Sequence, residues 1–349
     1  MAEWHMVVPT SRHGSSMVND PLEALRDRGV LDWEPLRQSD HAEVSSLAAA
    51  VEHLDDALER HSIDEILDSL EKSGEDVSQV AVVGRDRRGS IVAYGLDLVH
   101  PKDTSPRRVR LVGGIHPGWR DKGIGHALLE WQLAAAKRWD YATRRAHHGP
   151  LKVYAVADSK LTAVRELYES YGLLPETWYL DAHRKFNPDK PPTPPEVPDA
   201  VALRPYPSVP AVAVLAAHNE AFLGRLGAKQ IGPAEWHESM TRPGSRPELS
   251  WALTVGDRVI GYALNCVEDT SDDEPQEGWT DRLGVIPGWR GQGLSGLLLQ
   301  ASATSFFEAG LPGAGIGVDT DDPIAEMARY RGLGYDAVDA LVGYARVLH

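Results

Sequence analysis

The chain has 349 residues, of which 42% are hydrophobic and 25% are charged, a length and composition typical of a folded protein with two domains. Its formal net charge of −15 argues against a nucleic-acid partner, and its single cysteine, Cys266, excludes an internal disulfide framework and a cysteine-rich metal site. No apolar run approaches the roughly 18 residues of a membrane span, and the first residues lack a secretory pattern, so we expect a cytoplasmic protein with neither a membrane nor a metal partner.

The first half alternates apolar runs with turn-rich segments. Two of the runs are separated by the segment from Gly84 to Gly89, which is typical of a hairpin. A later helix ends at Gly172, because glycine readily adopts the conformation that terminates a helix. Residues 1–30 form an extension, to which we assign no function. The predicted short helix of the extension covers residues 21–28, and the predicted strands cover residues 31–35, 80–83, 91–99 and 151–157.

The second half begins after residues 186–200, a segment whose prolines favour an extended, semi-rigid linker. Beyond this linker the same order of elements returns, with Gly256 and Asp257 at the hairpin turn and Gly334 at the end of the last helix. The predicted strands cover residues 201–205, 251–255, 259–267 and 314–318. The repetition predicts two tandem domains, residues 31–185 and 201–349.

A twelve-residue motif occurs once in each half. Residues 114–125 read GIHPGWRDKGIG and residues 284–295 read GVIPGWRGQGLS, at a constant separation of 170 residues. The shared proline, tryptophan, arginine and glycines indicate an internal duplication. In both copies the apolar residues that follow recur at i, i+3, i+4 and i+7, so the motif leads from a strand into an amphipathic helix.

The motif has the properties of a phosphate-binding loop. A turn at a helix start leaves backbone N–H groups without partners at the positive end of the helix dipole, which attracts an anion. Gly123 and Gly125, like Gly291 and Gly293, let an anion approach closely, and Ser295 replaces the last glycine with another small residue. The segments match neither a dinucleotide-binding fingerprint nor a nucleoside-triphosphate loop.

Both copies resemble the Arg/Gln-x-x-Gly-x-Gly/Ala signature of the GNAT N-acetyltransferase superfamily, fully at residues 120–125 and with one conservative departure at residues 290–295. The tandem arrangement, with GVDTDDPIAEMARYRGLGYDA at residues 317–337, further resembles the mycothiol synthase family. The resemblance implies a mixed α/β fold of two tandem acyl-CoA N-acyltransferase domains, each a twisted mixed sheet flanked by helices.

The same resemblance implies acetyl-CoA as co-substrate. By the family's pattern each loop holds the pyrophosphate, and the preceding strand aligns the pantetheine arm. The cofactor-binding residues so assigned are Gly114, Ile115, Arg120, Asp121, Lys122, Gly123, Ile124 and Gly125 in the first copy, and Leu283, Gly284, Val285, Arg290, Gly291, Gln292, Gly293, Leu294 and Ser295 in the second.

Amide formation from a thioester needs an acid for the departing thiolate and a base for the acceptor ammonium. The resemblance places the acid, a tyrosine, in the helix after the fifth strand, where Tyr168 and Tyr330 both lie. For each tyrosine, packing in the core is the alternative role.

A candidate base distinguishes the two halves. Asp281 precedes Pro287 by six residues, and strand alternation places it on the same face as Leu283 and Val285. The same count in the first copy reaches Leu111, which has no carboxylate. The second half is therefore the expected catalytic half.

In that half we expect Tyr330 to act as the acid and Asp281 as the base, with Glu277 as the reserve base. An acidic connection leads to the strand and would favour a cationic acceptor, the alternative being that charged turns are simply solvated. Its acidic residues are Glu268, Asp269, Asp272, Asp273, Glu274 and Glu277.

The sequence thus predicts an acetyl-CoA-dependent N-acetyltransferase that acts on a primary amine of a small molecule by direct attack, as a monomer or homodimer. Two alternatives stay open. One is a catalytically silent acyl-CoA-binding or regulatory protein, and the other is an acyltransferase that uses a longer acyl-CoA.

Overall fold

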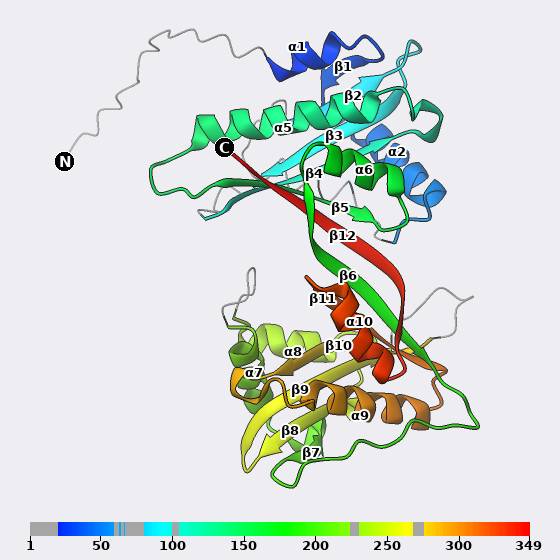
Figure 1. Ribbon diagram of the computed structural model, residues 1–349, viewed down its shortest axis with the longest axis vertical. Coiled ribbons are helices and arrows are strands. Elements are labelled where there is room, and N and C mark those ends of the chain that lie inside the picture. Colours follow the sequence, from blue (N-terminus) through cyan, green and yellow to red (C-terminus); the bar gives the residue numbers. More distant parts are fainter. Residues whose placement is uncertain are drawn as a thin grey trace, which may run out of the picture. The chain divides into compact units, whose positions relative to one another are not determined.

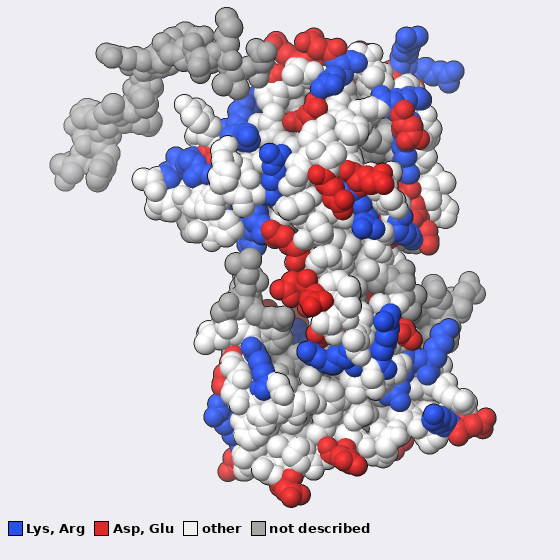
Figure 2. Space-filling view, in the orientation of Figure 1, with Lys and Arg blue, Asp and Glu red and all other residues white. Residues whose placement is uncertain are grey.

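The computed structural model describes residues 20–58, 63, 66, 80–99, 105–223, 230–267 and 276–349, which form two compact units (Figure 1). Unit 1 takes its residues from 1–155, 166–173 and 345–349, and unit 2 comprises residues 156–165 and 174–344. On the face shown in Figure 2, acidic and basic side chains are interspersed over each unit. No helix in the described ranges is long and apolar enough to cross a membrane.

In unit 1 the strands follow the order β1-β2-β3-β4-β5. Strands β1 to β4 are antiparallel neighbours, and β5 runs parallel to β4. The strands are β1 (Asp32–Pro35), β2 (Ala81–Arg85), β3 (Ile91–Val99), β4 (Arg107–Ile115) and β5 (Leu151–Asp158), and the helices of this half are α1 (Pro21–Arg26), α2 (His41–Leu54), α5 (Ile124–Thr143) and α6 (Thr162–Ser170).

The apolar face of α5 forms much of the core of unit 1. Its predicted core residues, among them Leu128 and Trp131, are buried as the helical spacing requires. Leu22 and Leu25 of α1 pack into the same cluster. The short helix of the N-terminal extension is therefore part of this core.

In unit 2 the strands follow the order β12-β6-β11-β10-β9-β8-β7. Its strands are β6 (Leu174–Lys185), β7 (Ala202–Pro205), β8 (Trp251–Val255), β9 (Arg258–Val267), β10 (Gly278–Val285), β11 (Gly313–Thr320) and β12 (Asp336–Leu348), and its helices are α7 (Ala211–Ala221), α8 (Pro233–Thr241), α9 (Leu294–Glu308) and α10 (Pro323–Gly332). The bounds of the predicted strands differ from the observed ones by at most two residues.

Helices cover both faces of the unit 2 sheet. On β9, the Tyr262 hydroxyl bonds to His218 of α7, whereas the Asn265 side chain bonds to Ser302 of α9. Residues three apart on a strand point to opposite faces, so α7 lies on one face and α9 on the other. Trp236 of α8 packs beside Tyr262 and so belongs to the α7 face. Helix α10 shares an apolar cluster with α9.

Strand β6 precedes the linker in sequence, yet it pairs antiparallel with β11 inside unit 2, from Trp178 opposite Thr320 to Lys185 opposite Gly313. Residues 345–349, which include the end of β12, belong in turn to unit 1. The linker, residues 186–200, contains no helix or extended strand. Each unit therefore takes strand residues from beyond its own half of the sequence.

Candidate active site

In both units a parallel strand pair is hydrogen-bonded over only part of its length. Strand β10 pairs with β11 over Gly278–Thr280, and β4 pairs with β5 over Arg107–Arg110. Beyond Thr280, residues Arg282–Val285 stay paired with β9, but residues Asp281–Val285 have no strand partner on the β11 side within the described part of the chain. This edge of β10 presents backbone N–H and C=O groups to an extended ligand.

Each splayed strand leads to a helix whose first turn lacks a side-chain cap. Gly123 and Gly293 are the N-caps of α5 and α9, both with φ of 76° and neither with a capping side chain. An added Cβ at Gly293 would meet nothing within 4 Å. The free N–H groups at the positive end of the helix therefore face open space, as a diphosphate requires. The residues present fit acetyl-CoA.

The two loops differ at one strained position. Asp121 has φ of 62° and its counterpart Gly291 has φ of 75°, so both lie in the left-handed region. Glycine adopts this conformation without cost, whereas aspartate is strained there. Asp121 also brings a negative charge to the first loop, which would disfavour an anion there. In both respects the second loop is the more favourable of the two for an anion.

The arginines of the motif brace the loops. Nε of Arg120 donates to the Ile115 carbonyl at 3.3 Å, and its two terminal nitrogens bind the Asp55 carboxylate at 2.7 and 2.8 Å. Arg290 likewise donates to the Val285 carbonyl at 3.1 Å and to the Ala221 carbonyl. Each guanidinium ties the loop to the end of the strand before it and to the end of α2 or α7.

Other predicted cofactor residues divide between the loop and the core. Lys122 donates to the Gly118 carbonyl at 2.9 Å and lies 4.4 Å above the Trp119 ring. Ile124 and Leu294 are buried in the two cores, so only their backbone groups are available to a ligand.

The two glycines near the strand ends are covered by tyrosine rings. A Cβ at Gly114 would lie 2.6 Å from the Tyr94 ring, and a Cβ at Gly284 would lie 2.6 Å from the Tyr262 ring. These glycines make room for a ring from the neighbouring strand, a packing reason that the motif alone did not reveal.

Tyr330 lies in the apolar cluster between α10 and the sheet and is only 7% exposed. Burial raises its pKa to about 12, because the phenolate is poorly solvated there. Leu283, on the splayed edge of β10, packs against the same cluster. The tyrosine is therefore both a core residue and a protonated neighbour of the candidate site, whereas Tyr168 of α6 is half-buried.

Asp281 lies on a β-bulge, and the alternation used to orient it is wrong at this point. The register between β10 and β9 shifts between Thr280 and Arg282, so the extra residue breaks the period of two. The Asp281 carboxylate is held by Arg242 at 2.8 Å and by Arg282 at 3.6 Å. A substrate ammonium would have to compete with both guanidinium groups. No such register shift interrupts the pairing of β4 with β3.

Glu277 is four residues from Asp281, just before β10 begins, and binds Nδ1 of His183. His183 comes from β6 and packs edge-on against Trp279 at 5.6 Å. Sequence spacing could not have found this partner, because β6 precedes the linker. The other acidic residues of the connection, Glu268 to Glu274, lie outside the described residues.

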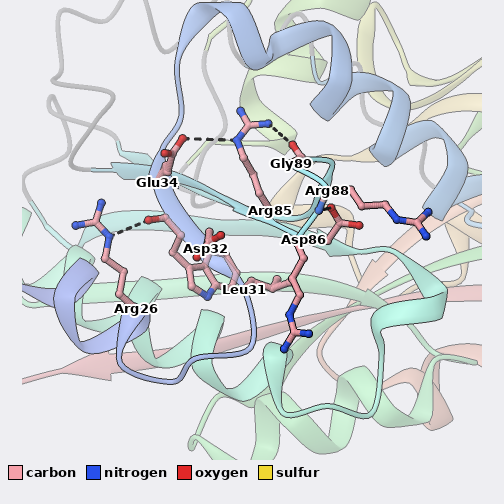
Figure 3. A pocket seen from close by; sticks show the side chains of 10 residues that line it. Arg26, Leu31, Asp32, Glu34, Arg85, Asp86, Arg88 and Gly89 are labelled. Atoms are coloured by element: carbon pink, nitrogen blue, oxygen red, sulfur yellow. Dashed lines mark hydrogen bonds and ion pairs between the residues drawn. The ribbon is translucent and has the colours of Figure 1, made fainter.

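A separate hollow of about 630 Å³ lies beside β1 and the β2–β3 turn of unit 1, away from both loops in sequence (Figure 3). Arg85, which lines it, binds Asp40 at 2.7 Å and the Gly89 carbonyl at 3.0 Å. Arg26 donates to the Trp33 carbonyl at 2.9 Å. The arginines Arg26 and Arg85 are thus already engaged within the fold. No group of three or more potential metal ligands occurs within the described ranges.

Comparison with known proteins gives this geometry a family context. Residues 228–335 match the model of the acetyltransferase (GNAT) family. A GCN5-related N-acetyltransferase from Sphaerobacter thermophilus is similar in structure, with a TM-score of 0.61 and 22% identity over 91% of this chain and 96% of that chain. No curated protein sequence matches the chain.

Two further solved structures are similar. A tandem GNAT protein from the clavulanic acid biosynthesis pathway has a TM-score of 0.53 and 17% identity, over 91% of this chain and 98% of that chain. A glucosamine N-acetyltransferase region of a fungal multi-domain β-N-acetylglucosaminidase has a TM-score of 0.55 and 15% identity, over 90% of this chain and 38% of that chain. The chain therefore carries a GNAT acetyltransferase family domain in residues 228–335 and, over about nine-tenths of its length, has the fold of GCN5-related N-acetyltransferases, tandem GNAT proteins among them.

Proposed function

We propose that the protein transfers an acetyl group from acetyl-CoA to a primary amine of a small molecule, and that unit 2 carries the reaction. The observation that carries this proposal is the free edge of β10, residues Asp281–Val285, which leads through the loop of residues 286–293 to the uncapped start of α9. An extended pantetheine arm would pair with this edge while the diphosphate binds the helix start.

Three differences between the copies favour unit 2. The bulge at Asp281 turns the strand where it leaves β11, and β-bulges are common beside active sites. The loop has glycine at position 291, where the first copy has Asp121. The family model matches residues 228–335, within the second half.

Tyr330 is the proposed acid. With its pKa raised to about 12 it is protonated at neutral pH, and an ordinary thiol has a pKa of about 8.5. A phenol with this pKa would stabilise the departing thiolate by donating a hydrogen bond to the sulfur, with little net proton transfer.

Two carboxylates are proposed as bases, and their partners differ. Asp281 is held by two guanidinium groups, which cannot accept a proton. Glu277 is paired with His183, whose imidazole can accept one. Asp281 lies at the point where the strands separate, whereas Glu277 is further back, so its proton transfer would run through water. Asp281→Asn and Glu277→Gln, compared by the pH dependence of kcat, distinguish the two bases.

The proposal is tested by measuring CoA binding and turnover in the full-length protein. Calorimetry should detect CoA and acetyl-CoA, and CoA release should follow when a panel of primary amines is added. Propionyl- and succinyl-CoA test the acyl preference. Binding without turnover of any amine would instead indicate an acyl-CoA-binding protein, and absence of binding would refute the proposal.

A further inference from the structure

Two arginines share one carboxylate beside the candidate site. Arg242, just after α8, and Arg282, on β10, both approach Asp281, at 2.8 and 3.6 Å. Two positive charges face one negative charge, so this group carries a surplus of one positive charge. Nη1 of Arg282 is buried and has no hydrogen-bond partner in the described part of the chain. A buried donor without a partner is costly.

Among the described residues, the groups packed around Arg282 add no second anion beside Asp281. Its guanidinium carbon lies 5.5 Å from the centre of the Trp236 ring, a favourable cation–π position. His218 and Tyr262, nearby, satisfy each other through a 2.6 Å hydrogen bond. Burial, together with the charge of Arg282, lowers the pKa of His218 to about 4, so this imidazole is neutral at pH 7. Neither His218 nor Tyr262 therefore supplies a negative charge to Arg282.

The position of Arg282 is suited to an acceptor. It follows the bulge directly and lies two residues before Gly284, on the edge proposed to bind the pantetheine arm. Its pairing with Leu264, two residues from Tyr262, and its approach to Trp236 place it on the α7 and α8 face. The opposite face is filled by the apolar cluster around Tyr330. Helices α7 and α8 cover the other face as well, but the side chains of Arg282 and Asp281 remain 27% and 31% exposed, so an acceptor would reach the thioester from the side where Arg282 lies.

We infer that Arg282, supported by Arg242, binds an oxyanion on the acceptor, so that the substrate is a primary amine that also carries a carboxylate or phosphate group. This inference rests on the proposed function. Guanidinium groups bind both oxyanions in a fork geometry, and one such charge-assisted contact changes affinity by about 10- to 100-fold. Amino acids are one source of such an acceptor and amino-sugar phosphates are another. A polyamine has no anionic group and is therefore not the substrate class that we infer.

The first test compares acceptors that differ only in the acidic group. CoA release is measured for the standard amino acids against their amides, for glucosamine 6-phosphate against glucosamine, and for spermidine. The best acceptor should be anionic, with kcat/KM about 10- to 100-fold above that of its uncharged partner. Whether that acceptor is an amino acid or glucosamine 6-phosphate then shows which oxyanion, carboxylate or phosphate, the site binds. An uncharged amine or spermidine as the best acceptor overturns the inference.

Substitutions of Arg282 test whether this residue causes the preference for an anionic acceptor. Arg282→Gln should bring the ratio of kcat/KM between the anionic and the uncharged partner close to one, and Arg282→Lys should restore part of that ratio. Arg258→Gln, which removes an exposed arginine at the start of β9 bound to Glu220, is the matched control and should keep the preference. A preference that survives Arg282→Gln overturns the inference.

A binding measurement separates this inference from the proposed function. N-acetyl forms of the amino acids, N-acetylglucosamine 6-phosphate and their uncharged counterparts are titrated into the wild type and Arg282→Gln by calorimetry. If the wild type binds an anionic compound of this set and the Arg282→Gln variant does not, the oxyanion site is supported, even if no amine is acetylated and the proposed function fails. Equal binding of charged and uncharged members overturns the site, even if turnover is observed.

Discussion

Replacing Asp97 by asparagine should stabilise unit 1 by an amount that grows with pH. The side chain is 0% exposed on β3, and neither carboxylate oxygen has a hydrogen-bond partner among the described residues. Burial raises the pKa of this carboxyl well above its ordinary value, because the charged form is poorly solvated. Unit 2 has Asn265 at the corresponding place, three residues after the tyrosine that covers the strand glycine, and its amide is fully engaged by Leu249 and Ser302.

The sign follows from proton linkage. A carboxyl whose pKa is higher in the folded state binds its proton more tightly when folded, so its full contribution is present below the unfolded pKa of about 3.9. That contribution is lost as pH rises toward the folded pKa, at up to about 1.4 kcal/mol per pH unit. Asparagine does not titrate and avoids this loss. The Asp97→Asn variant and the wild type should therefore diverge in stability as pH rises from about 4.

Urea unfolding at a series of pH values measures this divergence. Asp32→Asn on β1 removes the same charge from an exposed position of unit 1 and is the matched control. It should show no such divergence. A stability difference between Asp97→Asn and the wild type that does not change with pH, or that the control reproduces, would refute the reasoning.

Three further predictions concern unit 2. Gly293→Ala should weaken CoA binding in calorimetry, because a residue with a Cβ is strained by about 1 kcal/mol at φ of 76° and the loop would change shape. The counterpart Gly123→Ala should leave the affinity unchanged if unit 2 binds the cofactor. Tyr330→Phe should lower kcat at least about tenfold with little change in the KM for acetyl-CoA, and equal losses in both would remove the tyrosine from the acid role. The wild type should lose stability as pH falls from 6.5 to about 4, since the buried His218 is neutral in the folded state; the loss reaches about 3 kcal/mol, and a His218→Gln variant with the same acid sensitivity would contradict this origin.

Much of the architecture could be predicted from the sequence, because it depends on patterns of residues that are close together in the chain. The hairpin turns, the helical spacing of Leu128 and Trp131 and the glycine stops at 172 and 334 depend on neighbours in the chain, and each was found where expected. The duplicated loop was equally readable, since its backbone geometry follows from its own residues. The contacts of the motif arginines that hold the loops could not be predicted, because Asp55 is 65 residues away from Arg120 in the sequence.

The site beyond the loop depends on long-range packing, which explains the sequence-based errors. A bulge has no reliable sequence signal, so counting by two misoriented Asp281. Arg242 is distant in sequence from the carboxylate that it holds, and His183 reaches Glu277 only because β6 joins the sheet of unit 2. The charge of Arg282 in a strand that is otherwise mostly apolar near its end was the one available signal, and its role depends on Trp236, which is 46 residues away.

The exchange of strand residues between halves has a consequence for how the chain is made. Unit 1 includes residues 345–349, which are synthesised 187 positions after β5 ends at Asp158. At about 5–20 residues per second, the ribosome needs about 10 to 40 s to cover this distance. Throughout that time unit 1 lacks residues 345–349, so its maturation is tied to the synthesis of the second half of the sequence.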